Sequence, residues 1–562
     1  MIHRRGRGHR PRSLLALAAA GLAVLSLPGA AGAAPPDRPA RAVASASGQE
    51  AGPAPVLTGQ TPSVAVGDTF EVRLDPASLP AGGSVAVALH GRVRSRSELA
   101  ASMDGEGLRT VVYDVARSVT ELGTSADGSR VIGISLDPAA PGGLNVSAPG
   151  VYPLEVTALD AAGARLGTLV THLVLAPQPD DESPPLSVAV VARVPDGPAL
   201  QPDGSIDLDP EVLAESALWA AALAASGAPV NVAVGPEALS AIAADPRPPA
   251  AELVAGLRQL AATGSVVARP YAPSSPDALA AAGLPEELAR QMDAGQAALR
   301  DILGVSPSPG TWLAGGDLDE AGVGLLRGVG VRHVVVAADQ VAPLRSGLLS
   351  LSLAQPFLLP ADDDADPIDA LSLDDQILEH LDSDAEPALE ASRVLTELAM
   401  LWFEQPGVPR AAVIPVSPRV RPEVVSALVS GLERSHVLEP VRVDDAFDRA
   451  EPLRQPGGGR VDRTLTPEDH APIARPVRTG LASARRLLAS FAGLVGDAEP
   501  SLQTAQAHLL LATSSALDET EQEAHLTAAT AVVDGVTGMV TAPVRETITL
   551  TARDGTVPLT LR

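Results

Sequence analysis

The sequence of 562 residues contains no cysteine and no lysine, so all 41 of its basic residues are arginine. The absence of cysteine excludes disulfide bonds and thiolate metal sites, and packing must therefore supply the stability of the fold. Aromatic residues are also scarce, at 2% of the chain against 46% hydrophobic residues. Alanine, leucine and valine must fill the cores, which we expect to be divided among ~3 to 4 domains.

Basic charge at the N-terminus precedes an apolar run at residues 14–27, which ends at Pro28-Gly29 and is followed by small residues at 31–33. This pattern is typical of a secretory signal peptide at 1–33, with cleavage expected before Ala34. A transmembrane helix is the alternative, but the run is short for one. Without this segment the net charge falls from −27 to about −32, which disfavours nucleic acid or anionic lipid as a partner. We therefore expect an exported protein, extracellular or in the cell envelope.

Two kinds of hydrophobic pattern follow a linker at 34–55, which is expected to be disordered because it is rich in Pro, Ala, Gly and Ser. Residues 56–178 contain short alternating runs separated by turns, which predict an antiparallel β-sandwich of immunoglobulin type, an interaction or spacer module. Residues 186–448 alternate buried-strand runs with helical stretches. That alternation predicts a (β/α) barrel, with an open doubly wound sheet as the alternative.

The remainder of the chain is expected to be mainly helical. A polar linker is predicted at 449–475 and a helical hairpin or bundle at 476–541, where apolar residues recur at helical spacing. Residues 543–562 form a predicted β-hairpin around Asp554-Gly555. Because two strands alone are marginal in water, we expect this hairpin to begin a second β-sandwich that the intact gene product completes before a membrane anchor. The alternative is that the hairpin docks on the preceding segments.

The order of elements from Ala262 through Gly310-Thr-Trp-Leu-Ala-Gly-Gly316 to Val336 resembles the polysaccharide deacetylase family and its glycosidase relatives. The resemblance implies a catalytic Asp-Asp-Gly turn, but this chain has Pro195-Asp196-Gly197. It also implies two metal-binding histidines where Tyr271 and Ser275 stand. An arginine-bearing turn and a late histidine acid are implied at Trp312 and Pro415. Imidazoles are the usual zinc ligands, so we expect no tightly bound divalent metal, no cofactor and no metal-dependent deacetylation.

Over nearly its full length the chain also resembles an actinobacterial envelope family of unknown function, commonly encoded beside the lipid II flippase. The resemblance is carried by the export signal, the sandwich, Pro270-Tyr-Ala272 and Pro276-Asp277 in the barrel, the helical segment and the strand Glu546-Thr-Ile-Thr-Leu-Thr551. It implies partners among cell-wall polysaccharide or envelope-assembly proteins, and a C-terminal membrane helix that is absent from this chain.

Active sites of (β/α) barrels gather at the C-terminal ends of the strands. Candidate ligand-binding residues at this mouth are Asp196, Glu237, Tyr271, Asp277, Trp312, Asp317 and Asp339. A pair of these carboxylates could serve a glycosidase, but helix capping and first-turn placement explain Glu237 and Asp317 equally well. Trp312 and Tyr271 could form a sugar-stacking floor, with core packing as the alternative for Trp312.

No catalytic residue is assigned from these patterns. The sequence favours a non-catalytic polysaccharide-binding, peptidoglycan-binding or scaffolding protein built on a degenerate deacetylase-like barrel. The alternative is a glycoside hydrolase or deacetylase with a non-standard carboxylate site at the barrel mouth.

Overall fold

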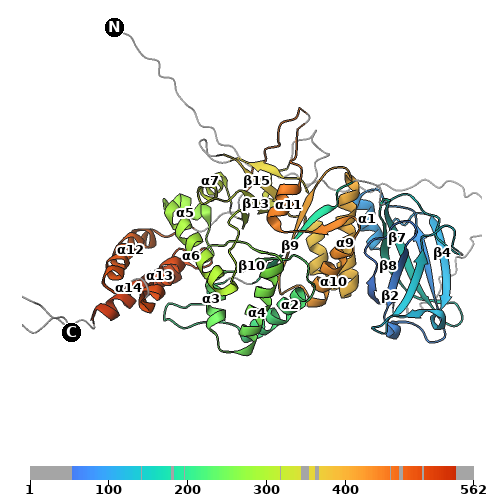
Figure 1. The fold of residues 1–562 in the computed structure, drawn as a ribbon, viewed down its shortest axis with the longest axis horizontal. Helices are drawn as coiled ribbons and strands as arrows, with labels where there is room; N and C mark the ends of the chain where they lie inside the picture. The colour runs from blue at the N-terminus through green and yellow to red at the C-terminus, as the bar shows by residue number, and fades with distance from the viewer. Residues whose placement is uncertain are drawn as a thin grey trace, which may run out of the picture. The chain divides into compact units, whose positions relative to one another are not determined.

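The protein is multidomain: an N-terminal region of β-sheets is followed by a central region of alternating strands and helices and then by three helices (Figure 1). The computed structural model describes residues 54–140, 142–178, 183–194, 197–316, 318–343, 354–360, 366–455, 457–466, 472–495 and 499–538. The expected signal peptide at 1–33, nearly all of the expected linker at 34–55 and the expected hairpin at 543–562 lie outside these residues. All described residues belong to one compact unit, Ala51–Arg562.

The N-terminal region contains two antiparallel four-stranded sheets. The first has the order β1 (Leu57–Gln60), β2 (Thr69–Leu74), β6 (Arg130–Ser135), β5 (Gly123–Thr124). The second has the order β4 (Val111–Ser118), β3 (Ser84–His90), β7 (Gly150–Leu159), β8 (Arg165–Leu175). Alternation produces this packing: in β2, Phe70, Val72 and Leu74 are buried while Thr69 and Glu71 face solvent. A single hydrophobic cluster combines side chains of both sheets.

The central region alternates strands with helices, as the hydrophobic pattern predicts. One sheet has the order β11 (Ser265–Val266), β10 (Asn231–Ala233), β9 (Leu186–Arg193), β16 (Ala411–Val416), and β17 (Leu438–Pro440) also pairs with β9. The other has the order β12 (Thr311–Leu313), β13 (His333–Val336), β15 (Ile368–Ser372), β14 (Phe357–Leu359). All pairings are parallel except that of β14 with β15.

Most helices of this region start at capping residues or at proline in the first turn. Asp209, for example, caps α2 by accepting hydrogen bonds from the backbone N–H groups of Glu211 and Val212. The α-helices are α2 (Pro210–Ala224), α3 (Pro236–Ala244), α4 (Pro248–Thr263), α5 (Pro276–Ala282), α6 (Pro285–Leu303), α7 (Glu320–Gly328), α8 (Asp375–Glu379), α9 (Pro387–Glu404), α10 (Pro422–Glu433) and α11 (Val443–Arg449). Short 3₁₀ turns are η3 (Ala338–Gln340) and η4 (His380–Asp382), and α1 (Arg96–Met103) belongs to the N-terminal region.

The strands of the described residues do not form the single closed barrel that the pattern predicts, because they divide into two sheets. Several are too short to sustain a continuous ladder, and only an isolated bridge between Val267 and Ser308 connects the two sheets there. The sheets nevertheless share an inner core. Ala189, Val191 and Val413 from the first sheet cluster with Val335 and Leu371 from the second.

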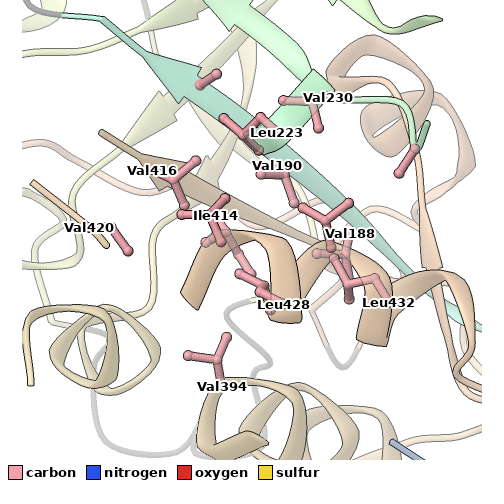
Figure 2. Close-up of a cluster of buried hydrophobic side chains, with 14 of the residues drawn as sticks. Val188, Val190, Leu223, Val230, Val394, Ile414, Val416, Val420, Leu428 and Leu432 are labelled. Atoms are coloured by element: carbon pink, nitrogen blue, oxygen red, sulfur yellow. The ribbon is translucent and has the colours of Figure 1, made fainter. Parts of the chain in front are cut away.

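A second cluster covers the outer face of β9 and β16. Figure 2 shows Val188 and Ile414 pointing toward Leu428 and Leu432 of α10, with Val394 of α9 beyond them. Even and odd positions of β9 thus enter different cores, which explains why this strand is apolar throughout instead of alternating.

The described part of the expected linker at 449–475 is packed, contrary to its polar composition. Leu453, Val461 and Ile473 are buried in the cluster that covers the second sheet. Isolated bridges pair Leu465 with Val341 and Asp462 with Leu358. The segment between the central region and the helices is therefore part of the fold.

Three helices follow: α12 (Arg475–Val495), α13 (Pro500–Leu511) and α14 (Glu519–Gly538) (Figure 1). They enclose a cluster that includes Leu481, Leu488, Leu502, Leu509 and Val533. In the part of the chain that is described, no helix has the length and apolar character needed to cross a membrane.

Candidate functional site

The C-terminal ends of the parallel strands define the mouth, where the sequence places its candidates. Five of the seven are described: Glu237, Tyr271, Asp277, Trp312 and Asp339. Asp196 and Asp317 lie outside the described residues. The ligand-binding role of all seven stays a prediction, and the contacts of the five show what else each side chain does.

Glu237 lies in the first turn of α3, directly after β10, and is 3% exposed. Its carboxylate accepts hydrogen bonds from the backbone N–H groups of Ala199 and Leu200, both at 2.8 Å. Burial raises the pKa of Glu237, although these two hydrogen bonds oppose the shift. The carboxylate thus anchors the loop that follows β9.

Tyr271 lies in the loop between β11 and α5, which we call the mouth loop. Its backbone connects this loop to helices α6 and α3. Its N–H donates to the carbonyl of Gln291 at 2.9 Å, and its carbonyl accepts from the N–H of Glu237 at 3.0 Å. Burial, together with the charge of Glu237, raises the pKa of the Tyr271 phenol to about 12, so the hydroxyl stays protonated at neutral pH. Gly295 lets α6 approach this loop, since a Cβ there would lie 2.0 Å from the carbonyl oxygen of Arg269.

Asp277 lies in the first turn of α5 and is 2% exposed. Its Oδ1 accepts from the N–H groups of Asp319 at 2.9 Å and Gly322 at 3.0 Å. A Cβ at position 322 would lie 2.3 Å from this oxygen, so glycine is required for the contact. Asp277 therefore joins α5 to the start of α7.

Trp312 and Asp339 differ in exposure. Trp312 is 7% exposed and packs in the core of the second sheet. It also lines a cavity at the mouth, so its position allows both core packing and contact with a ligand. Asp339 is exposed in η3, and its backbone carbonyl accepts from the hydroxyl of Thr466 at 3.3 Å.

The mouth cavity has a volume of about 150 Å³. Polar and aromatic residues that line it are Arg193, Arg269, Ser274, Ser275, Trp312 and Ser515. The described lining residues include no carboxylate, and Glu237, Tyr271, Asp277 and Asp339 are not among them. Guanidinium, hydroxyl and indole groups offer hydrogen-bond donors and an aromatic face, which bind polar ligands but do not form a carboxylate acid–base pair.

Of these six residues, the sequence patterns named only Trp312 as a candidate ligand-binding residue. Arg193 could have been found, because it follows the inward-facing Ala189 and Val191 at the same alternation and ends β9. Arg269 follows the β11 run in the same manner. Ser515 carries no local signal, since it is more than 200 positions away from the strands it approaches.

Two positions at which the resemblance implies a histidine, a metal ligand at Ser275 and a general acid at Pro415, have structural roles here. Ser275 caps α5, with its hydroxyl accepting from the N–H of Ala278 at 3.1 Å. Pro415 pairs in register with Val191 within β16. Within the residues described, no group of three or more His, Cys, Asp or Glu side chains is arranged to hold a metal ion.

Two roomier hollows lie away from this mouth. One, of about 480 Å³, is lined mainly by small residues of β1, α2, α9 and α10. The other, of about 370 Å³, lies between the loop after β9 and helices α2, α3 and α4. Neither gathers residues from the ends of several parallel strands, which is where barrels of this type bind their ligands.

No protein-family model matches the chain, and no curated protein does. Solved structures overlap it at low identity. A 4-alpha-glucanotransferase from Thermococcus litoralis is 13% identical, with a TM-score of 0.40, over 58% of this chain and 55% of that one. The alpha-amylase AmyC from Thermotoga maritima is 11% identical, with a TM-score of 0.44, over 63% of this chain and 94% of that one.

Polysaccharide deacetylase-like folds also occur among these neighbours. A probable polysaccharide deacetylase from Pseudomonas aeruginosa PAO1 is 12% identical, with a TM-score of 0.32, over 47% of this chain and 90% of that one. The chain spans just over half the length of the glucanotransferase, and overlaps at these TM-scores assign no activity to it.

Proposed function

We propose that this protein is an exported, non-catalytic component of the cell envelope that holds a polysaccharide or peptidoglycan group in the mouth cavity. The observation that carries the proposal is that the carboxylates near the mouth and the groups that line the cavity belong to different residues. Glu237 and Asp277 are buried and hydrogen-bonded to backbone N–H groups, whereas the cavity is lined by Arg193, Arg269 and Trp312.

The size of the cavity supports a small group as the ligand. Its volume of about 150 Å³ is roughly ten times the ~10–15 Å³ that a single water molecule needs on the same measure. A sugar ring or a substituent of one fits such a space, and a longer chain would extend outside it. Arginine fits this role because its planar group presents several donors in fixed directions to sugar hydroxyls or carboxylates.

The N-terminal sheets support a spacer of immunoglobulin type within this proposal. Their strand orders correspond to the A-B-E-D and C′-C-F-G arrangements of that fold. Tyr152 near the start of β7 donates its hydroxyl to the carbonyl of Ala148 at 2.5 Å, a contact typical of the F strand in such domains. Export is supported by the N-terminal pattern at 1–33.

The proposed partners are cell-wall polysaccharide and proteins of envelope assembly. A place in the actinobacterial envelope family is part of this proposal, and the order of export signal, sandwich, parallel-strand region and helices supports it. Nucleic acid is not a proposed partner, because the net charge is −27.

The test is retention by insoluble peptidoglycan and by purified envelope polysaccharide in co-sedimentation. The Arg193→Ala variant should lose most of the retention, since Arg193 is exposed at the cavity and removing it should leave the fold intact. Arg165→Ala is the matched control, an arginine 66% exposed on β8. Equal retention of wild type and Arg193→Ala would refute the assignment of the site.

The alternative is a hydrolase or deacetylase with a carboxylate site at the same mouth. The observation that favours it is that Asp317 stands in the sequence between Gly315 and Leu318, which both line the cavity. Assays of the same incubations for released acetate and new reducing ends distinguish the two. Turnover that Asp317→Asn abolishes would replace the binding proposal with the enzymatic one.

A further inference from the structure

The cavity at the mouth is not built by the central region alone. Ser515, in the turn between α13 and α14, lines it together with Pro273, Ser274 and Ser275 of the loop before α5. The N–H of Ser515 donates to the carbonyl of Pro273 at 2.8 Å. Its side chain is exposed, so it borders the opening instead of the core.

A buried glutamine holds this turn in place. Gln291 on α6 is 0% exposed, and its Oε1 accepts from the N–H of Ala272 at 2.9 Å. Its Nε2 donates to the carbonyl of Leu510 at 2.8 Å and to the hydroxyl of Thr513 at 3.2 Å. One side chain therefore connects the mouth loop and the C-terminal helices, and both halves of its amide are satisfied.

Further contacts fix the helices in the same position. Arg485 of α12 donates to the carboxylate of Glu287 on α6 at 2.6 Å, and Glu287 is 3% exposed. Gln522 of α14 donates to the carbonyl of Ser514 at 2.9 Å, which orders the turn itself. The turn is thus secured from α6, from α14 and from the mouth loop.

We infer that the α13–α14 turn, through Ser515, is the specificity-determining wall of the mouth cavity. The helical segment is then a part of the ligand site, which sets the size of the sugar group that enters, and not a separate assembly module. The inference rests on the proposed function, since it concerns the ligand that the same cavity holds.

The first experiment compares Ser515→Trp with Ser515→Ala in co-sedimentation with insoluble peptidoglycan. The indole should fill the opening and weaken retention at least tenfold, whereas alanine should leave it within twofold of wild type. Ser490→Trp on the exposed face of α12 is the matched control for a surface tryptophan, and should also stay within twofold. Wild-type retention by Ser515→Trp would overturn the inference while leaving the proposed function in place.

A second experiment does not need a ligand. Because the chain has no cysteine, the pair Pro273→Cys and Ser515→Cys introduces the only two thiols. Mild oxidation should close a disulfide across the loop and turn, seen as a mobility shift in non-reducing electrophoresis, and Pro273→Cys with Ser490→Cys should not. If wild type fails to bind peptidoglycan, the proposed function falls. In that case absence of the crosslink would also overturn the placement of the turn beside Pro273, whereas its presence would retain the turn as a border of the cavity.

Discussion

Arg96 connects the N-terminal sheets to the central region, and replacing it with alanine should destabilise both. Its Nη1 and Nη2 donate to the two carboxylate oxygens of Asp374 at 2.5 and 2.8 Å, and its Nε donates to Glu397 at 3.0 Å. Burial alone would lower the pKa of Arg96, but the hydrogen bonds and charges of Asp374 and Glu397 outweigh it and raise the pKa. The guanidinium is therefore charged at every pH at which the protein is folded.

The expected magnitude follows from what the alanine leaves behind. The side chains of Arg96, Asp374 and Glu397 are 15%, 9% and 2% exposed, so two carboxylates would remain buried without their cation. Removing one member of such a buried group costs about 3–5 kcal/mol. For domains of this size each kcal/mol lowers the Tm by about 2–4 °C, so the expected decrease is roughly 6–20 °C.

Differential scanning calorimetry near pH 7 measures the effect. Arg96→Lys should give an intermediate loss, because it retains the charge but not the two-pronged contact with Asp374. Arg165→Ala is the control: this arginine is exposed in its pair with the partly buried Glu155, so its removal should cost at most about 1 kcal/mol. A decrease for Arg96→Ala no larger than that of the control would refute this account of the contact.

Other predictions concern buried ionisable groups. Burial acts to raise the pKa of Asp444, but the neighbouring His333, whose Nδ1 lies 3.7 Å away, and hydrogen bonds from Ser308 and Thr311 lower it to about 2. This carboxylate should therefore contribute up to about 2 kcal/mol of stability above pH 4, which is lost as pH falls through 2. Asp444→Asn should therefore lower the urea midpoint at pH 7 but leave it nearly unchanged at pH 2. Burial, and secondarily His508, lowers the pKa of His525 to about 4, and the two Nδ1 atoms lie 2.9 Å apart. Because the unfolded chain takes up that proton near pH 6.5, the free energy of unfolding should fall by up to about 3 kcal/mol between pH 6.5 and 4. A His525→Gln variant whose free energy of unfolding depends on pH as steeply as that of wild type would contradict this. Glu237→Gln should cost about 2–3 kcal/mol in urea unfolding, because the NH₂ group of the glutamine would face a backbone N–H and leave it without an acceptor. The variant should retain peptidoglycan as wild type does. Loss of retention in the folded variant would place Glu237 in the site.

Local patterns predicted much of the secondary structure. The alternating run Thr69–Leu74 forms an antiparallel strand with its apolar side inward, and the continuous run Leu186–Arg193 forms a parallel strand between two cores. The spacing of hydrophobic residues indicates which faces of a strand or helix are buried, and this spacing can be read within a short stretch of sequence. Closure of the barrel could not be predicted in the same manner. It depends on pairing between distant short strands such as β11 and β12, and these fall in separate sheets.

Of the seven residues that the sequence proposed for the candidate site, Trp312 is among the described residues that line the mouth cavity, whereas Glu237 and Asp277 are not. Glu237 and Asp277 follow strands as a barrel site requires, and their carboxylates accept hydrogen bonds from backbone N–H groups of neighbouring loops and helices. Their sequence positions suit either task, because helix starts attract carboxylates with or without a ligand. The choice between the two depends on which N–H groups lie within 3 Å, and that is a tertiary distance.

By itself the sequence determined the order of strands and helices, the charge and the absence of thiol chemistry, since each of these follows from composition or from a period of two to four residues. Only the tertiary structure decided that Leu453 and Val461 of a polar segment are buried, and that Ser515 borders the mouth beside Pro273. These contacts join residues that are tens to hundreds of positions apart. Their partners are selected by the packing of whole elements, and no local period records that packing.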